Sequence, residues 1–142
     1  MSNIEELCCG NFAAMQFCKV LWDWCQWIDD TLDRDKTWLP ELAIKTNLNA
    51  IVVFSENEFF QRHRDVLGAL VMLAARAQGD SIEWAKRKSR KDRRAADILK
   101  SLYHEIFWQV AFFSAVEAGK DGWEHLTNMT RKYRAFDYDY KN

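Results

Sequence analysis

The sequence predicts an all-α fold, in which residues 1–142 form a single helical bundle of about five to six helices. One proline and five glycines leave few turn residues for a fold of many strands. Apolar residues recur at spacings of three and four, which is typical of amphipathic helices. A hydrophobic content of 49% at this length is enough for one core and too high for a disordered chain.

The longest predicted helix runs from about Asn11 to Lys36. Each helical residue advances ~100°, so regularly spaced apolar residues form one stripe that we expect to face the core. Pro40 disfavours helical geometry in the residue before it and suits the first turn of a second helix. The residues of the expected stripe are Ala14, Leu21, Cys25, Ile28 and Leu32.

Turn and capping signals divide the rest of the chain. A capping box from Ser55 to Glu58 predicts the start of a third helix, and Gly79 predicts its end. Asp80 and Glu83 resemble a second capping box. The predicted helices are 41–54, with Ile44, Leu48 and Ile51 or Val52 on one face, then 57–78, 80–88, 94–118 and 123–134.

Charge is distributed unevenly along the chain. Seven lysines and arginines lie in residues 86–94 against the single Asp92, although the whole chain has a net charge of −1. This balance argues against a general nucleic-acid binder but leaves a local basic patch. The patch is interpreted either as a solvated linker or helix start, or as a rim that attracts phosphate groups.

Cysteine and histidine positions argue against a structural zinc site, because no CxxC pair occurs and the histidines are scattered. Reduced thiols in a cytoplasmic protein are expected. We also see neither a secretion signal nor an apolar stretch long enough to span a membrane. The cysteines are Cys8, Cys9, Cys18 and Cys25, and the histidines are His63, His104 and His125.

Three aspartates with DDxxD spacing form the strongest candidate metal site. Asp29 and Asp33 are one helical turn apart, beside the apolar stripe, whereas Asp30 points further towards water. Mg²⁺ accepts one or two carboxylates together with waters and phosphate oxygens, so the motif favours diphosphate chemistry. The alternative is a helix that ends in a solvated acidic turn.

Two segments carry a resemblance to a known family. Residues 24–33, WCQWIDDTLD, are similar to the first aspartate-rich motif of squalene and phytoene synthases, and residues 126–131, LTNMTR, look like the start of their second. The resemblance implies an all-α isoprenoid synthase fold, whose two motifs face each other across a cavity and bind Mg²⁺ and a substrate diphosphate. The residues expected on the substrate side are Gln26, Tyr103, Asn128, Arg131 and Lys132.

The chain departs from this family at the second motif. Lys132 and Phe136 stand where aspartates should follow, only Asp137 is nearby, and the chain is much shorter than is usual. The resemblance therefore favours a bundle with a Mg²⁺ site at Asp29 and Asp33 over prenyl transfer itself. A compact, degenerate, phage-like relative that has lost the full reaction fits the same residues.

Two classes of function remain open, and no catalytic residue is assigned. The first is a Mg²⁺-dependent protein that binds or acts on an isoprenoid diphosphate, or less readily a helical nucleoside triphosphate pyrophosphohydrolase, which needs a second acidic cluster. The second is a non-catalytic interaction protein, a homodimer or the partner of another protein. Seven tryptophans and nine phenylalanines favour it, because Trp22, Trp24 and Trp27 point in different directions around one helix.

Overall fold

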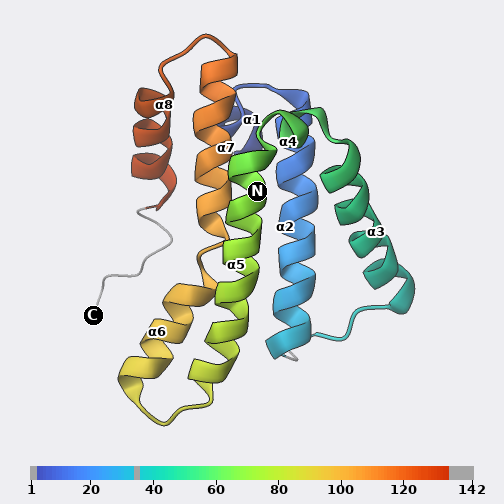
Figure 1. Cartoon of the computed structure of the whole chain (residues 1–142), viewed down its shortest axis with the longest axis vertical. Coiled ribbons are helices and arrows are strands. Elements are labelled where there is room, and N and C mark those ends of the chain that lie inside the picture. The colour runs from blue at the N-terminus through green and yellow to red at the C-terminus, as the bar shows by residue number, and fades with distance from the viewer. Residues whose placement is uncertain (1–2, 34–35, 135–142) are drawn as a thin grey trace.

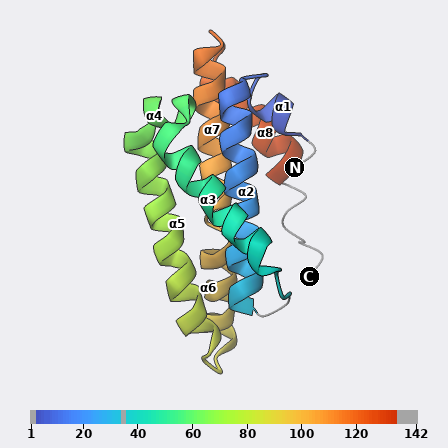
Figure 2. The same cartoon turned by 90° about the vertical axis from the view of Figure 1, so that its right-hand side faces the viewer.

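The computed structural model describes residues 3–33 and 36–134, and these contain helices and no strand (Figure 1). The predicted all-α fold is therefore confirmed. Helices α2 (Phe12–Asp33), α5 (Arg64–Ala85) and α7 (His104–Glu117) run roughly along the long axis of the molecule (Figures 1 and 2). No described helix has the length and apolar character needed to cross a membrane.

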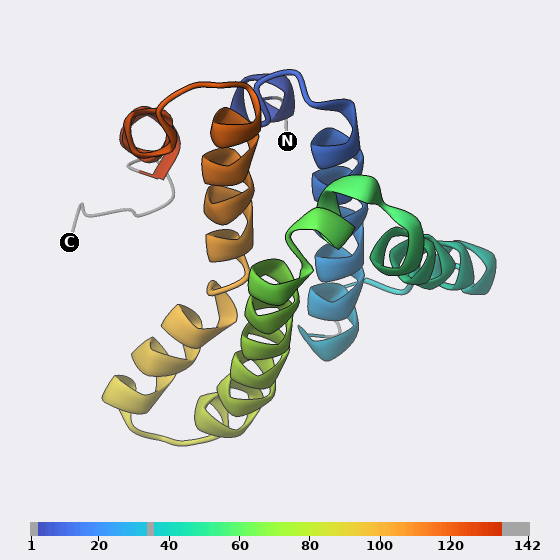
Figure 3. The same cartoon turned by 45° about the horizontal axis from the view of Figure 1, so that its top comes forward.

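Helices α2 and α3 (Pro40–Glu56) lie close to their predicted positions. Figure 3 shows α3 on the outer side of α2, away from α7. Trp22 packs against Tyr103 and Phe107, whereas the Trp24 ring packs edge-on against Phe54 of α3. Trp22 and Trp24 thus contact different neighbours, although both pack against the same hydrophobic core.

The predicted third helix is wrong at both ends and in its middle. Helix α3 continues through Ser55, and Asn57 caps α4 (Glu58–Arg62) by accepting a 2.9 Å hydrogen bond from the Phe60 amide. His63 leaves helical geometry, with φ −116° and ψ 20°, and separates α4 from α5. Gly79 does not end α5, which runs on to Ala85, so no separate helix begins at residue 80.

The predicted 94–118 helix is also wrong, because it is two helices. Helix α6 (Arg90–Lys100) begins at Ser89, and a short turn over residues 101–103 leads into α7. Helix α8 (Gly122–Met129) then packs on α7, followed by the π-helical turn η1 (Thr130–Arg134). Near the start of the chain lies the short α1 (Ile4–Leu7).

The core is built around α7, which is buried on several sides. Helices α1, α2, α4 and α5 each place apolar side chains against it or against its neighbours. Gly122 allows α8 to approach closely, since a Cβ there would lie 2.9 Å from the side chains of Phe112 and Val116. The largest fully buried side chains are Leu7, Phe17, Leu21, Phe59, Leu67, Ile106 and Val110.

Candidate functional site

An apolar cavity of about 260 Å³ lies between α2 and α5, and we call it the α2–α5 cavity. Small residues on α5, including Ala74 and Gly79, leave space opposite the larger Trp24 and Ile28 of α2. Tyr103, in the turn before α7, also lines it. Apolar cavities with a few polar groups are the usual form of small-molecule sites.

Asp29 supplies a carboxylate at this cavity. Its Oδ1 lies 3.0 Å from the Nζ of Lys100, the last residue of α6, and both side chains are about one-third exposed. Lys100 is well placed because a cation is favoured at a helix C-terminus. The cavity margin thus carries one acid and one base from segments far apart in the sequence.

Tyr103 lines the same cavity, and the Gln26 side chain lies near its hydroxyl group. Burial raises the pKa of Tyr103 to about 12, with smaller contributions from the neighbouring Cys25 and from the carboxylate of Asp29. Burial, together with Asp29, likewise raises the pKa of Cys25 to about 12. Both groups therefore remain neutral near pH 7 and can offer hydrogen bonds but no charge.

Asp30 of the motif does not line the cavity. The Asp30 Oδ2 accepts a 2.9 Å hydrogen bond from the Trp38 indole. The side chain of Asp33 falls outside the part of the chain that the structure describes. Within that part, no three His, Cys, Asp or Glu residues are grouped to hold a metal. A Mg²⁺ site at this motif stays a prediction.

The second segment of the family resemblance is placed elsewhere. Asn128 lies on α8, and Arg131 and Lys132 lie in η1. Figure 1 shows α8 beside the upper part of α7, away from the lower, C-terminal end of α2. The Lys132 Nζ is 3.1 Å from both carboxylate oxygens of Glu6. The fold therefore brings Gln26, Asp29 and Tyr103 close together. Asn128, Arg131 and Lys132 lie elsewhere.

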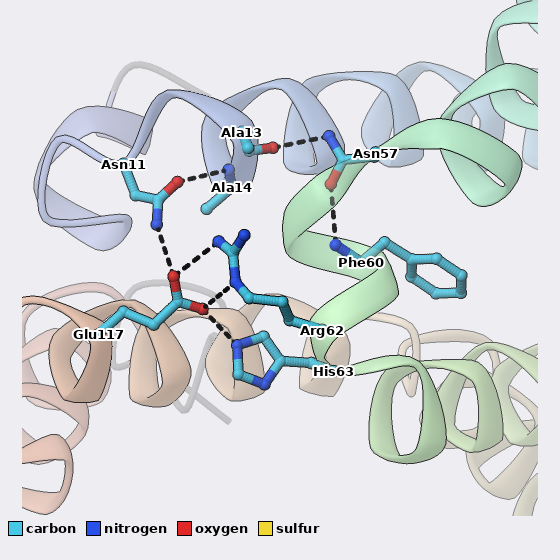
Figure 4. Close-up of polar contacts among 8 residues, drawn as sticks. All are labelled: Asn11, Ala13, Ala14, Asn57, Phe60, Arg62, His63 and Glu117. Carbon is cyan, nitrogen blue, oxygen red and sulfur yellow. Dashed lines mark hydrogen bonds and ion pairs between the residues drawn. The ribbon is translucent and has the colours of Figure 1, made fainter.

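A polar cluster around Glu117 was not predicted from the sequence (Figure 4). The Glu117 carboxylate accepts hydrogen bonds from Arg62 Nη2 at 2.7 Å and Asn11 Nδ2 at 3.2 Å, and it is also paired with His63. The His63 ring stacks on Phe113 with centroids 4.0 Å apart. No sequence motif marks this cluster, since its members come from three distant segments.

The Glu117 cluster serves to hold the fold together. Partial burial opposes ionisation of Glu117, but the hydrogen bonds from Arg62 and His63 outweigh it and lower the pKa of the carboxyl group. Both carboxylate oxygens are engaged by side chains of the protein itself. The cluster therefore joins α4, α7 and the start of α2.

A cysteine–histidine contact near α1 does not form a nucleophilic pair. The His125 Nε2 lies 2.9 Å from the carbonyl oxygen of Leu7 and 3.5 Å from the Cys9 Sγ. A nitrogen that donates to the carbonyl cannot also accept the thiol proton. Burial raises the pKa of Cys9, which further disfavours the reactive thiolate.

No family model, curated protein or solved structure matches this chain.

Proposed function

We propose that this chain binds an amphiphilic small molecule, with an apolar body in the α2–α5 cavity and an anionic, diphosphate-like head at Lys100 and Asp29. The observation that carries the proposal is an apolar cavity with one ion pair at its margin. An apolar body gains ~0.8 kcal/mol for each CH₂ group removed from water. The polar margin would then fix which end of the ligand faces outwards.

The cavity volume limits the size of the ligand. A cavity of about 150 Å³ accepts benzene, so 260 Å³ corresponds to roughly ten carbon atoms. A ten-carbon prenyl group is of this size. The proposal is thus compatible with the isoprenoid diphosphate implied by the resemblance, and it requires no catalytic step.

Mg²⁺ would add to head-group binding. Asp29 can supply one carboxylate ligand, and Mg²⁺ commonly completes its shell with phosphate oxygens and water. Lys100 can contribute positive charge directly to the same phosphate group. Under this proposal, Mg²⁺ strengthens binding of a diphosphate and has little effect on an uncharged analogue.

Calorimetric titration with geranyl diphosphate, geraniol and inorganic pyrophosphate, each with and without Mg²⁺, tests the proposal. Ala74→Leu fills the cavity and should weaken geranyl diphosphate binding at least about tenfold, because a ligand methylene contributes ~0.8 kcal/mol and several are displaced. Ala69→Leu is the matched control, since Ala69 is exposed on α5 and does not line the cavity.

The head-group contact has its own variant. Lys100→Met should weaken geranyl diphosphate binding without affecting geraniol, whereas Lys45→Met, on exposed α3, should affect neither. Absence of heat with geranyl diphosphate and geraniol alike would refute the proposal. So would equal affinities of the Ala74→Leu and Ala69→Leu proteins.

A second candidate function, self-association, is favoured by the outer face of α3. We call the exposed residues of this face the α3 stripe. The apolar face predicted for α3 lies in solvent. The opposite side of the helix, including Ala50 and Val53, is buried against the bundle. The exposed fractions are 60% for Ile44, 55% for Leu48, 61% for Ile51 and 52% for Val52.

The spacing of the α3 stripe favours a second copy of the same chain as its partner. Ile44, Leu48 and Ile51 follow the alternating spacing of four and three that lines a helix–helix seam. A two-fold axis beside Leu48 would pair the stripe with itself. Light scattering should show a wild-type dimer and a Leu48→Glu monomer, with Leu73→Glu, exposed on α5, as the control. A monomeric wild type would refute this candidate.

A further inference from the structure

Seven basic side chains gather where α5 turns into α6, at the lower end of the molecule in Figure 1. All seven are exposed. We call this group the basic end. Its members are Lys86, Arg87, Lys88, Arg90, Lys91, Arg93 and Arg94.

Most of this charge has no ion-pair partner among the described residues. Lys86 is paired with Glu83 at 3.0 Å, and Arg87 lies 3.8 Å from Asp92 and over the Trp84 ring. Within residues 3–33 and 36–134, the other five members form no salt bridge. Five exposed cations in seven residues therefore face solvent together.

This arrangement acts against the stability of the helix that carries it. The N-terminal end of a helix bears partial positive charge and favours acidic side chains, each by ~0.3–1 kcal/mol. Helix α6 instead begins Arg90, Lys91 and continues with Arg93 and Arg94, and Asp92 is the one acid in its first turn. An anionic partner would relieve this repulsion.

We propose that the basic end binds the phosphate backbone of nucleic acid without regard to base sequence. Arg90, Lys91 and Arg94 lie side by side on α6, around a shallow groove that Ala95 and Ile98 also line. Arginine is suited to phosphate because its guanidinium can donate two parallel hydrogen bonds to the oxygens. Backbone contacts of this kind supply affinity without reading bases.

The net charge of −1 does not oppose this assignment. Exposed charges further apart than the Debye length, ~8 Å in physiological salt, are largely screened from one another. The acids close to the basic end in sequence are Asp80, Glu83, Asp92 and Asp97, two of which are already paired with Lys86 and Arg87. A phosphate backbone at this end therefore meets a locally positive surface, contrary to the expectation from whole-chain charge.

A membrane surface fits the basic end less well. Helices that lie on membranes insert an apolar face below the head groups. Residues 86–94 contain no apolar side chain, and Ile98 is the exposed large aliphatic residue of α6. The other exposed large apolar side chain beside the basic end is Trp84, whose ring lies under Arg87. Two separate side chains do not form the apolar face that such a helix inserts.

Salt-dependent anisotropy titrations with a short DNA duplex test the proposal. Each neutralised phosphate contributes about −0.9 to the slope of log K against log salt, so five contacts give about −4.5. Binding should then weaken about 500-fold between about 50 and 200 mM salt. The triple variant Arg90→Gln, Lys91→Gln, Arg94→Gln should reduce the slope to about −1.8 and the loss to about 12-fold.

A matched triple variant distinguishes an effect of the basic end from an effect of the total charge of the protein. Lys19→Gln, Lys45→Gln, Lys120→Gln removes three exposed cations from other parts of the fold and should leave the slope unchanged. Equal slopes for the two triple variants would overturn the proposal, as would no duplex binding at about 50 mM salt. Binding to vesicles of anionic lipid without binding to DNA would overturn it in favour of a membrane. Circular dichroism of both variants would check that they are folded.

Discussion

Replacing Glu117 by glutamine is expected to loosen the junction of α4, α7 and the start of α2. The substitution keeps the shape of the side chain but removes the charge that Arg62 and His63 contact. Hydrogen bonds to a charged group contribute about 1.5–3 kcal/mol when the site is buried. Because the Arg62 side chain is 47% exposed, solvent screening reduces the expected loss to about 1–2 kcal/mol.

The stabilisation by Glu117 is expected to decrease in acid. The pKa of Glu117 in the folded protein lies below its ordinary value of 4.5, so the unfolded chain binds the proton more readily. The stabilisation is therefore complete above about pH 5 and is lost as pH falls through the folded-state pKa. The difference in unfolding free energy between wild type and variant should shrink over that range.

Urea denaturation at a series of pH values measures both quantities, and at pH 7 the midpoint of thermal unfolding should fall by roughly 3–8 °C. Glu56→Gln, an exposed acid at the end of α3, should stay within about 0.5 kcal/mol of wild type. A Glu117→Gln protein as stable as wild type at pH 7, or a difference that persists unchanged in acid, would refute the reasoning.

Three further outcomes follow from burial and local space. Gly122→Ala should destabilise the fold by about 1–3 kcal/mol, because its Cβ would lie 2.9 Å from the side chains of Phe112 and Val116. Gly79→Ala should stabilise the fold by about 0.5–1 kcal/mol, because Gly79 lies in a helix interior and its Cβ would have nothing within 4 Å. Thermal unfolding of both variants distinguishes these outcomes. Leu67→Ala should cost about 2–5 kcal/mol in chemical denaturation, against about 0.5 kcal/mol for the half-exposed Leu73→Ala. Cys25, whose pKa is raised to about 12, should be alkylated at pH 8 at least about a hundredfold more slowly in the folded than in the unfolded protein, as peptide mapping would show.

Local sequence patterns were sufficient to predict the limits of α2 and α3 closely. The apolar periodicity of residues 12–33 predicted the extent of α2, and the proline at position 40 predicted where α3 begins. The prediction that Gly79 ends a helix was wrong, because a single glycine costs only ~1 kcal/mol in a helix interior. Packing of α6 on α5, which buries Ala77 and Ser81 on either side of it, offsets that cost.

The interruption at His63 could not be predicted from neighbouring residues. His63 is held by the ring of Phe113 and by Glu117, both on α7. The capping signal was also ambiguous, because Ser55 fits the capping-box pattern but Asn57 reaches both the Phe60 amide and the Ala13 carbonyl. Contacts between distant segments decided both outcomes.

The candidate site was only partly accessible from the sequence. Helical geometry placed Asp29 beside the apolar stripe, and Asp29 does line the α2–α5 cavity. Its partner Lys100 belongs to α6 and could not be found from spacing along α2. The size of the cavity likewise depends on how α5 lies opposite α2, which no local pattern specifies.

The interruption at His63 also constrains which lengths of chain can form this fold. Loops usually tolerate inserted residues, but here the junction sets the rotation of α5 relative to α4. One added residue would turn α5 by ~100° about its own axis and shift it by ~1.5 Å. Val71 and Ala74 would then leave the wall of the cavity, and Leu67 would leave the core. Homologous chains are therefore expected to preserve the spacing across this position, without inserted or deleted residues.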